Sequence, residues 1–378
     1  MNNYDVYIII ASKDWPIVNK SLPYIKKNLG ARNVVIVSSA AVLHNDLQGC
    51  KFLDESAALK ESCGITYDAV KDCLVKFGAI PNNAGWFLQQ FIKLGIARIC
   101  KDDYYLVWDG DTIPLNPIPF FAKDGRPYFT LKREYFYAYF RTIKNLFGIK
   151  KSKRESFVSE HMLFNTAMTR EMLDKIEDLQ KYEGEFFWQK ILAASDLLVH
   201  DYIKKDQRFF SEYETFGSYC DKFYKGFYAG RKLRTLRFGV DFLGPDPSPD
   251  ILNWASKDFD TVSFERWGTP LSKMLEMVQN PEYRNEMSFA NAIRKFYIEA
   301  RRSVFRCFPH IDHEIFSYYL DVLLGKTGYD FFFGKRPVFR RVVTNLGLKI
   351  CEFLDKFRFL YVARGRIMRY WRLLTYRF

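Results

Sequence analysis

The chain has 378 residues, of which 48% are hydrophobic and 18% aromatic; this is enough apolar material for a sizeable core and excludes global disorder. Its formal charge of +13 is uneven, because residues 335–378 hold 12 Lys and Arg against two acidic residues and the rest carries only +3. A nearly neutral body argues against a nucleic-acid-binding protein.

The cysteines and the N-terminus favour a cytoplasmic protein. None of the seven cysteines forms a CxxC pair, so we expect reduced thiols and no disulfide framework. The first 15 residues lack the basic region of a signal peptide. No stretch of about 18 uncharged apolar residues occurs, so we expect no transmembrane helix.

Alternating apolar runs and amphipathic segments predict an α/β protein. Within the first 37 residues a strand, a helix opened by Pro16 and a second strand follow one another, which is typical of a βαβ unit in a parallel sheet. The basic segment 144–154 is predicted to be a mobile loop. We expect strands at 4–10, 33–37, 104–108, 128–131, 237–242 and 262–264, and helices at 16–28, 54–77 (interrupted), 85–99, 169–179, 185–194 and from 281 onward.

The sharpest signal for chemistry is the tripeptide Asp109-Gly110-Asp111. It directly follows the apolar strand 104–108, and ligands of open α/β sheets bind beyond the carboxyl ends of the strands. Alternation along an extended chain places both carboxylates on one side, and Gly110 would let a diphosphate approach the backbone. Carboxylates suit Mg²⁺ or Mn²⁺, so we predict a divalent metal at Asp109 and Asp111 that neutralises a departing nucleoside diphosphate.

The helix that precedes this strand carries a second candidate surface. Trp86, Gln90 and Lys93 stand at positions i, i+4 and i+7 and therefore share one face. Such a face can contact a base, a ribose and a phosphate, so we predict that it binds the donor together with Asp109. The alternative is an ordinary surface stripe.

Five segments then occur in a fixed order: IIIASKD, GWFLQQFIKLGIA, YYLVWDGDTIPL, HMLFN and FSEYETFG. Together they resemble a family of bacterial DxD-containing glycosyltransferases with a GT-A fold, of the domain-of-unknown-function type, that is associated with surface polysaccharide synthesis. The resemblance covers roughly residues 4–270. It implies a nucleotide-sugar donor, a UDP-sugar above all, with the metal at Asp109 and Asp111.

The resemblance also implies donor-binding roles for loop residues after the first two strands. Ala11, Ser12 and Lys13 would hold the base and ribose, and Ser38 would occupy the equivalent place after the second strand. The alternative is that these are ordinary loop residues.

A role for His161 rests on the same resemblance. His161 would complete the metal shell or contact the sugar, and Asn165 is its companion in binding substrate. The alternative for His161 is a buried core histidine whose hydrogen bonds are satisfied.

Glu212 and Glu214 are the candidate acid–base residues. They lie in a run rich in Phe and Tyr, where burial raises the pKa of a carboxyl group. Extended or helical spacing sends the two side chains in different directions, so we expect only one to deprotonate the acceptor hydroxyl in an inverting reaction. The alternative is a capping box in which Ser211 opens a helix and Glu214 completes it.

Residues 335–378 alternate Lys and Arg with bulky apolar side chains at helical spacing. A basic amphipathic helix of this kind lies in the membrane interface, where each basic residue adds roughly 1 kcal/mol. We therefore expect peripheral attachment to the cytoplasmic face of the inner membrane, an anionic surface where glycan and glycolipid acceptors grow. A helix packed on the body and a nucleic-acid contact are the alternatives.

The sequence thus predicts an α/β, GT-A-like (Rossmann-like) protein with a mostly parallel sheet flanked by helices over residues 1–270. A helical extension at 271–334 and the amphipathic tail at 335–378 follow it. The predicted function is a metal-dependent, hexosyltransferase-like glycosyltransferase that acts on a lipid-linked or surface polysaccharide such as LPS, O-antigen or capsule. A sugar nucleotidyltransferase, disfavoured because no Gly-rich loop follows the first strand, and a non-enzymatic membrane-bound scaffold are the alternatives. Inverting and retaining transfer both remain open.

Overall fold

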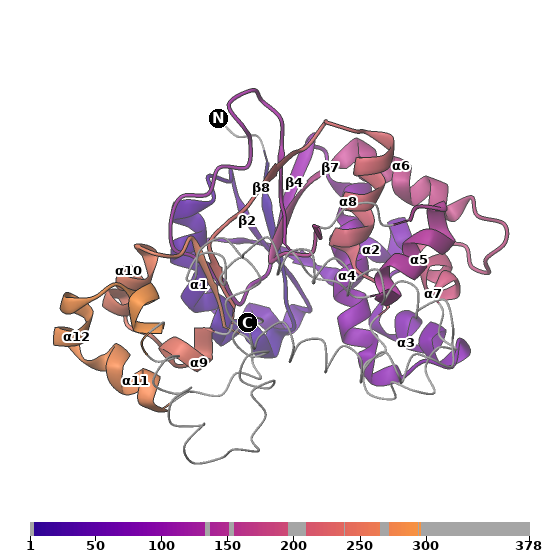
Figure 1. Cartoon of the computed structure of the whole chain (residues 1–378). Helices are drawn as coiled ribbons and strands as arrows, with labels where there is room; N and C mark the ends of the chain where they lie inside the picture. Colours follow the sequence, from indigo (N-terminus) through magenta and orange to yellow (C-terminus); the bar gives the residue numbers. More distant parts are fainter. Residues whose placement is uncertain are drawn as a thin grey trace, which may run out of the picture. The chain divides into compact units, whose positions relative to one another are not determined.

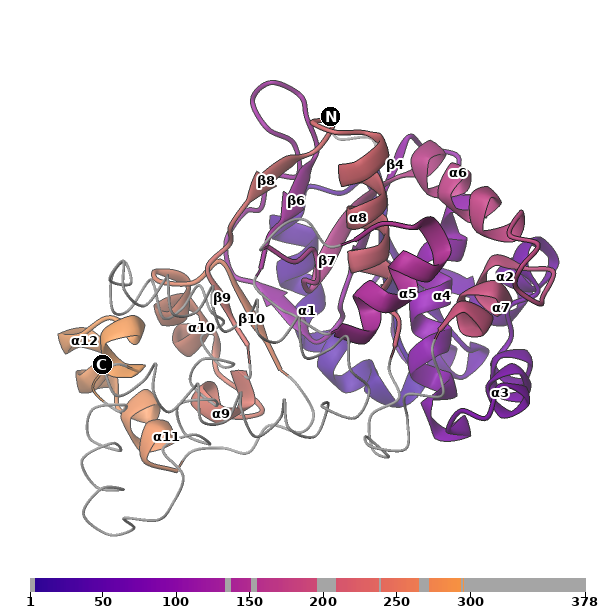
Figure 2. The ribbon, with the colours of Figure 1, turned by 45° about the vertical axis from the view of Figure 1, so that its right-hand side comes forward.

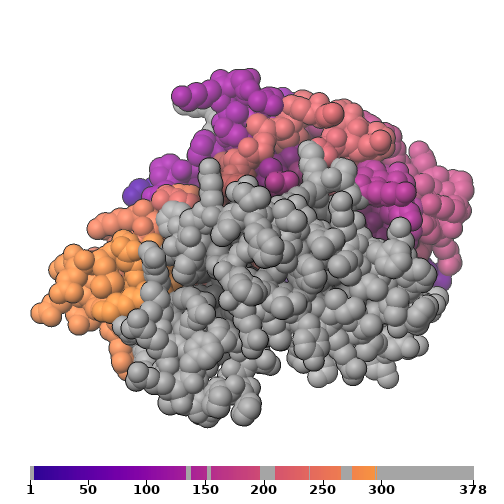
Figure 3. Space-filling view, in the orientation of Figure 1, coloured from indigo at the N-terminus to yellow at the C-terminus, as the bar shows by residue number. Residues whose placement is uncertain are grey.

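The computed structural model describes residues 4–132, 137–150, 155–195, 209–237, 239–264, 272–293 and 295, which Figure 3 colours by position in the sequence. The predicted tail at 335–378 lies outside these residues. The chain divides into two compact units, residues 1–233 and 234–378. The predicted boundaries at 270 and 334 remain predictions. The cysteines within the described residues, at positions 50, 63, 73, 100 and 220, carry free thiols.

The first unit is built on a five-stranded sheet with the strand order β3-β2-β1-β4-β7 (Figure 1). The register aligns Val6 with Val34 and Leu106, and Trp108 with His161. The parallel strands are β1 (Val6–Ile9), β2 (Val34–Ser38), β3 (Lys51–Asp54) and β4 (Tyr104–Trp108), and β7 (His161–Asn165) runs antiparallel to β4. This confirms the predicted α/β class with a mostly parallel sheet flanked by helices.

Helices cover both faces of this sheet (Figures 1 and 2). On one face α1 (Trp15–Asn28) packs its Val18 and Leu22 with Val6 and Ile8 of β1. The core on the other face includes Ile9 and is built from α2 (Glu55–Cys63), α3 (Tyr67–Lys76), α4 (Ala84–Ile99), α5 (Tyr137–Phe147), α6 (Thr166–Glu177), α7 (Phe187–Ala194) and α8 (Glu212–Phe223). Because successive strand residues enter opposite cores, the central strands are apolar without alternation.

The interrupted helix predicted over 54–77 is a pair of helices. The side chain of Asp54 caps α2 by accepting hydrogen bonds from the N–H groups of Ser56 and Ala57. Gly64 ends α2 with a φ of 62°, and the side chain of Thr66 then caps α3.

The prediction of a mobile loop over 144–154 was wrong for residues 144–147, because they complete helix α5. Phe140, Ile143 and Leu146 bury one face of this helix, whereas Lys144 is exposed. Lys144, the first charge of the predicted loop, therefore belongs to the solvent face of an amphipathic helix, whereas residues 148–150 follow the helix without regular structure. Residues 151–154 lie outside the described part of the chain.

Three short strands lie outside the five-stranded sheet in this unit. They are β5 (Thr112–Pro114), β6 (Tyr128–Thr130) and β8 (Ala229–Arg231). β6 and β8 pair in parallel and align Thr130 with Arg231.

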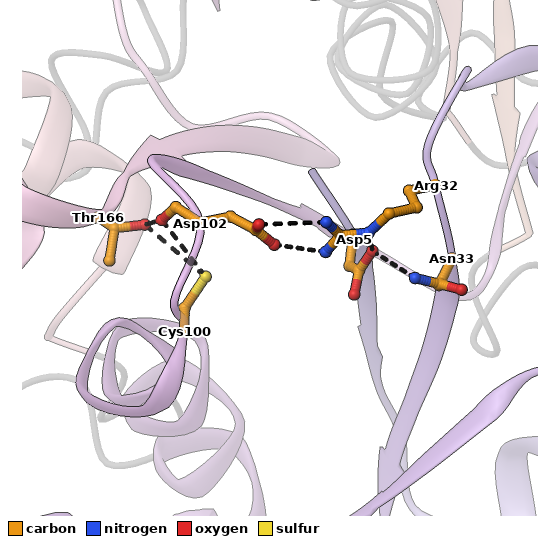
Figure 4. A network of polar contacts seen from close by, with 6 residues as sticks. All are labelled: Asp5, Arg32, Asn33, Cys100, Asp102 and Thr166. Atoms are coloured by element: carbon orange, nitrogen blue, oxygen red, sulfur yellow. Dashed lines mark hydrogen bonds and ion pairs between the residues drawn. The ribbon is translucent and has the colours of Figure 1, made fainter. Parts of the chain in front are cut away.

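A network of polar side chains lies at the edge of the sheet where the parallel strands begin (Figure 4). Arg32 donates from Nε to Oδ1 of Asp5 (2.9 Å) and from its terminal nitrogens to both carboxylate oxygens of Asp102 (3.2 and 2.5 Å). Asn33 also donates to Asp5 (2.8 Å), and the Thr166 hydroxyl donates to the carbonyl oxygen of Asp102 (2.7 Å). The network links the starts of β1, β2 and β4 to the end of β7.

The second unit contains the parallel pair β9 (Thr235–Leu236) and β10 (Thr261–Ser263). Its helices are α9 (Gly239–Leu243), α10 (Pro249–Ser256), α11 (Ser272–Gln279) and α12 (Pro281–Glu286). The strand predicted over 237–242 is wrong, because residues 239–243 form helix α9, and a segment this short does not distinguish a strand from a helix by its pattern. No helix among the described residues of either unit has the length and apolar character needed to span a membrane.

Candidate functional site

The tripeptide Asp109-Gly110-Asp111 follows β4 at the carboxyl edge of the parallel strands. The Asp109 N–H donates to the carbonyl oxygen of Glu160 (2.9 Å), and the Asp109 carbonyl accepts from the Thr112 N–H (3.0 Å). The Thr112 hydroxyl donates to Oδ1 of Asp111 (3.3 Å). The backbone is thus held on both sides of the turn, while the side chain of Asp109 stays 28% exposed.

Gly110 is required by the core beneath it. A Cβ at this position would lie 2.6 Å from Cγ2 of Val18 and 2.9 Å from Cγ2 of Ile8, closer than carbon atoms approach. The Gly110 carbonyl accepts a hydrogen bond from the hydroxyl of Ser21 on α1 (2.9 Å). Packing against α1 therefore accounts for the glycine without the close approach of a diphosphate that the sequence suggested.

Lys93 of α4 connects Asp109 to Glu212 of α8. Its Nζ donates to Oδ1 of Asp109 (2.9 Å) and to Oε1 of Glu212 (2.8 Å). The side chains of Lys93 and Glu212 are only 4% and 2% exposed. One buried cation is therefore shared between two carboxylates, and we call Lys93, Asp109 and Glu212 the Lys93 cluster.

The electrostatics of the Lys93 cluster follow from burial and pairing. Burial alone would lower the pKa of Lys93, but the two carboxylates outweigh it and raise this pKa well above its ordinary value. Burial raises the pKa of Glu212, and the pairing with Lys93 offsets part of that rise. The cluster thus sets two carboxyl groups against one ammonium group, and only the side chain of Asp109 is partly exposed to solvent.

Gln90 and Tyr213 complete the surroundings of this cluster. The Gln90 amide, oriented so that both of its ends are satisfied, donates to Glu212. The Tyr213 hydroxyl lies 3.4 Å from Oδ1 of Asp109, and burial raises the pKa of Tyr213 so that the phenol keeps its proton. Gln90 was predicted together with Lys93, but Tyr213 was treated only as part of an aromatic run. Its position between the two candidate glutamates was the available signal.

Glu214 contacts a different part of the chain. It is 1% exposed, and its Oε2 accepts from the hydroxyl of Ser156 (2.6 Å) and the N–H of Phe157 (2.8 Å). Ser211 caps α8 by accepting from the Glu214 N–H (3.2 Å), so the N-cap of the predicted capping box is present. Of the two glutamates, only Glu212 belongs to the Lys93 cluster.

His161 lies beside β4 but is enclosed by protein. It is 3% exposed, and its ring stacks on Trp108 with 4.7 Å between the ring centres. Its Nε2 lies 3.0 Å from the Thr130 hydroxyl and 3.3 Å from a terminal nitrogen of Arg231. Because a guanidinium can only donate, Nε2 accepts and the neutral ring carries its proton on Nδ1.

This arrangement does not fit the predicted place of His161 in a metal shell. Burial, aided by the charge of Arg231, lowers the pKa of His161 well below its usual value. Nδ1 is buried and has no hydrogen-bond partner among the described residues, but in this tautomer it presents a proton to its surroundings. Neither ring nitrogen therefore offers a lone pair to a metal.

Asn165 lies at the other end of β7. It pairs with Tyr104, whereas His161 pairs with Trp108, so about four residues or roughly 14 Å of strand separate Asn165 from the tripeptide. Its side chain caps α6 by accepting from the Met168 N–H (3.0 Å). The structure therefore does not bring Asn165 to the candidate site.

The remaining predicted donor-binding residues lie on neighbouring strands and on α4. Ala11 follows β1 and is exposed, and Ser12 and Lys13 form a short 3₁₀ turn. Ser38 ends β2; it is fully buried, and its hydroxyl has no hydrogen-bond partner in the described part of the chain. Trp86 is half-buried and packs edge-on against Phe87 (4.9 Å between ring centres). Of the predicted helix face, Lys93 belongs to the Lys93 cluster and Gln90 contacts it through Glu212.

The structure makes the tripeptide a turn and not the extended run whose alternation was expected to place both carboxylates on one side. Asp109 and Asp111 still supply carboxylate oxygens of the kind that Mg²⁺ and Mn²⁺ bind. Within the described residues, no three His, Cys, Asp or Glu side chains gather closely enough to hold a metal ion by themselves. Oδ1 of Asp109 is bonded to Lys93, and part of the same carboxylate is exposed. A divalent ion here would bind two carboxylates and take its other ligands from phosphate and water, as Mg²⁺ commonly does.

Sequence comparison identifies a family but no characterised relative. The model described as "Family of unknown function (DUF6492)" matches residues 30–222, just over half of the chain. This range contains the tripeptide, Lys93 and Glu212. No curated protein sequence matches the chain.

Several solved structures are similar at low identity. The galactosyltransferase LgtC, in complex with donor and acceptor sugar analogues, is 11% identical over 75% of this chain and 100% of its own, with a TM-score of 0.36. The glycosyltransferase GlyE of Streptococcus pneumoniae is 10% identical over 79% and 64% (TM-score 0.30), and mouse xyloside xylosyltransferase 1 is 11% identical over 72% and 100% (TM-score 0.34). TM-scores this low transfer neither an activity nor a site residue to this chain.

Proposed function

This chain belongs to the DUF6492 family of unknown function, and we propose that it is a glycosyltransferase whose donor is a nucleotide-sugar, most simply a UDP-sugar. The observation that carries the proposal is the Lys93 cluster at the end of β4, with Asp109 partly open to solvent. The carboxyl edge of a parallel sheet is where such folds bind nucleotides. The order of sequence motifs that resembles GT-A glycosyltransferases supports the same assignment.

In this proposal the residues of the cluster prepare one carboxylate for the donor. Asp109 and Asp111 would hold Mg²⁺ or Mn²⁺, whose charge, when bound, neutralises the departing nucleoside diphosphate. Lys93 donates to Asp109 and fixes the direction of its carboxylate. Glu212, which accepts from Gln90, in turn holds Lys93 in place, so that the site is organised before the donor arrives.

The pairing of Glu212 also bears on the stereochemical route. Glu212 is 2% exposed and bonded to Lys93 and Gln90, so it is poorly placed to take a proton from an acceptor hydroxyl. This favours a retaining route in which the leaving diphosphate guides the acceptor and Glu212 only holds the site, over an inverting route with Glu212 as base. Analysis of the anomeric configuration of the product by NMR distinguishes the two.

The test of the metal and donor site uses the two aspartates. Asp109→Asn and Asp111→Asn keep the side-chain size and remove the charge, so each is expected to weaken Mn²⁺-dependent UDP binding, measured by titration calorimetry, by about tenfold or more. Asp103→Asn, in an exposed position at the opposite end of β4, is the matched control and should bind as the wild type does. Unchanged Mn²⁺-dependent binding in both site variants contradicts the proposal.

The alternatives make different chemical predictions. A sugar nucleotidyltransferase would release pyrophosphate from a nucleoside triphosphate and a sugar phosphate, whereas a glycosyltransferase releases a nucleoside diphosphate. A membrane-bound scaffold would keep its cellular role when Asp109 and Asp111 are both replaced by Asn. Assay of the released phosphate species therefore separates the first alternative from transfer.

We also propose that the acceptor is a lipid-linked or surface polysaccharide, met at the cytoplasmic face of the inner membrane. This rests on the basic, aromatic sequence of residues 335–378, which lie outside the described residues. Full-length protein should co-sediment with anionic vesicles, and a variant ending at Gly334 should not. Equal binding by the two proteins would remove the membrane from the proposal.

A further inference from the structure

Helix α8 is linked to Asp109 by two separate routes. The first passes through side chains, from Glu212 to Lys93 and on to the carboxylate of Asp109. The second begins at Glu214, whose Oε2 accepts from the Ser156 hydroxyl (2.6 Å) and the Phe157 N–H (2.8 Å). Three residues after Phe157, the carbonyl oxygen of Glu160 accepts from the Asp109 N–H (2.9 Å).

Two further contacts fix the start of the second route. Lys132, which lies two residues after the end of β6, exchanges backbone hydrogen bonds with Ser156 (2.9 and 2.7 Å). These bonds tie the start of the segment to the chain that follows β6. Gly217, one turn along α8, lies directly against Phe157, because a Cβ there would come within 2.2 Å of the Phe157 ring. The segment 156–160 is therefore held against α8 by packing as well as by Glu214.

We propose that Glu214 is a positioning residue, which sets the place of the Asp109 backbone through residues 156–160. This rests on the proposed role of Asp109 in binding the donor. Residues two apart on a helix point in different directions, so Glu212 and Glu214 reach the two sides of the site from one turn. The same turn of α8 thus fixes the Asp109 carboxylate through Lys93 and the Asp109 N–H through Glu160.

Burial makes the hydrogen bonds of Glu214 hard to replace. Glu214 is 1% exposed and Ser156 is 1% exposed, so water cannot replace the hydrogen bonds that would be lost with the carboxylate. Removing the carboxylate leaves the Ser156 hydroxyl and the Phe157 N–H without this acceptor and loosens the path to Glu160.

The test compares hydrogen exchange in ligand-free variants. Glu214→Ala should raise exchange in peptides covering 104–112 and 156–161 by about tenfold. Glu214→Gln, which keeps an acceptor oxygen, should restore most of the protection, and Ser156→Ala, which removes one donor, should lie between them. Glu177→Ala is the matched control, because Glu177 also accepts a backbone N–H from a distant residue, Phe187 (3.1 Å), and its loss should leave the 104–112 peptide unchanged.

The same variants connect positioning to binding. Glu214→Ala should weaken Mn²⁺-dependent UDP binding by about tenfold, with recovery in Glu214→Gln. Wild-type exchange at 104–112 in Glu214→Ala overturns the positioning role, whatever happens at 156–161. A wild-type protein that does not bind UDP with Mn²⁺ overturns the proposed function alone, because the exchange experiment needs no ligand.

Discussion

The two edges of the central sheet each place one cation between two carboxylates, but in different surroundings. At the edge where the strands begin, Arg32 joins Asp5 and Asp102, and its side chain is 42% exposed. At the carboxyl edge, Lys93 joins Asp109 and Glu212, and its side chain is 4% exposed. The charges are the same in number, so the difference between the two networks is burial and geometry.

That difference decides how much each contact depends on its cation. The planar fork of Arg32 satisfies both of its carboxylates, and water screens the remaining charge, so its contribution is small. Lys93 offers one ammonium group to two carboxylates in a buried place, where desolvation offsets most of the attraction. Loss of the cation should therefore cost more at the carboxyl edge, where burial leaves a carboxylate without a partner and without water.

The largest expected effect comes from Lys93→Met. It leaves Glu212 buried and without its ammonium partner, and this class of change costs about 3–5 kcal/mol of unfolding free energy. The double variant with Glu212→Gln removes the stranded charge and should recover a large part of the loss. Urea unfolding measures both, and a cost for Lys93→Met no greater than that for a change at Arg32 would break the comparison.

A change of volume at the carboxyl edge should come next. Gly110→Ala places a methyl group against Val18 and Ile8, and overpacking of this kind costs about 1–3 kcal/mol. Gly85→Ala is the matched control: it lies near the start of α4 with open space around it, and alanine favours a helix. Chemical denaturation should show a lower free energy of unfolding for Gly110→Ala and an unchanged or higher one for Gly85→Ala. Equal stabilities would show that the turn at Gly110 moves to make room for the methyl group.

The pH dependence of stability should report the buried His161. Folding lowers the pKa of His161 well below its ordinary value of about 6.5. Just below pH 6.5 the unfolded chain therefore binds a proton at this residue and the folded chain does not. Stability is therefore fully present above pH 6.5 and falls below it, by at most about 1.4 kcal/mol per pH unit from this group.

His161→Phe keeps a ring on Trp108 and removes the titrating group. Unfolding midpoints measured from pH 7.5 down to 5.5 should therefore fall less steeply in this variant than in the wild type. His44→Gln changes an exposed histidine and serves as the control. Parallel wild-type and His161→Phe curves would show that His161 does not carry the dependence.

The smallest effect is expected at the amino edge. Arg32→Met removes a half-exposed side chain whose two ion pairs are screened by water, so the loss should stay within about 1 kcal/mol. High salt should reduce the wild-type advantage further. Thermal unfolding at low and high salt checks this; a loss as large as that of Lys93→Met would make burial irrelevant to the comparison.

The central sheet was predictable from the sequence because its strands are continuous apolar runs between clear turn signals. The place of Asp109 followed from the same pattern, since a residue directly after a parallel strand must lie at the carboxyl edge. Helical spacing also placed Gln90 and Lys93 on one face. The helix at 239–243 was missed because five residues are too few to separate the helical from the strand periodicity.

Contacts between side chains that are far apart in the sequence could not be predicted. Lys93 and Glu212 are 119 positions apart, and no local pattern says that one ammonium group lies between Glu212 and Asp109. The orientation of Glu214 toward Ser156 depends on how α8 packs, as does the enclosure of His161 beside Arg231. The direction of β7 likewise decides that Asn165 lies far from the tripeptide. Because β7 runs antiparallel to β4, its first residue lies beside Trp108 and its last residue, Asn165, lies beside Tyr104.

The most direct test of the account is thermal unfolding of the full chain with nucleotide-sugars and Mn²⁺. A UDP-sugar at 100 times its dissociation constant, with Mn²⁺, should stabilise the wild type by about 2.7 kcal/mol, or roughly 5–10 °C. UDP-sugar without metal, and Asp109→Asn with both, should give little or no shift. An absence of any shift across UDP-, GDP-, CMP- and ADP-sugars, or an equal shift in Asp109→Asn, would contradict the assignment of this edge as a donor site.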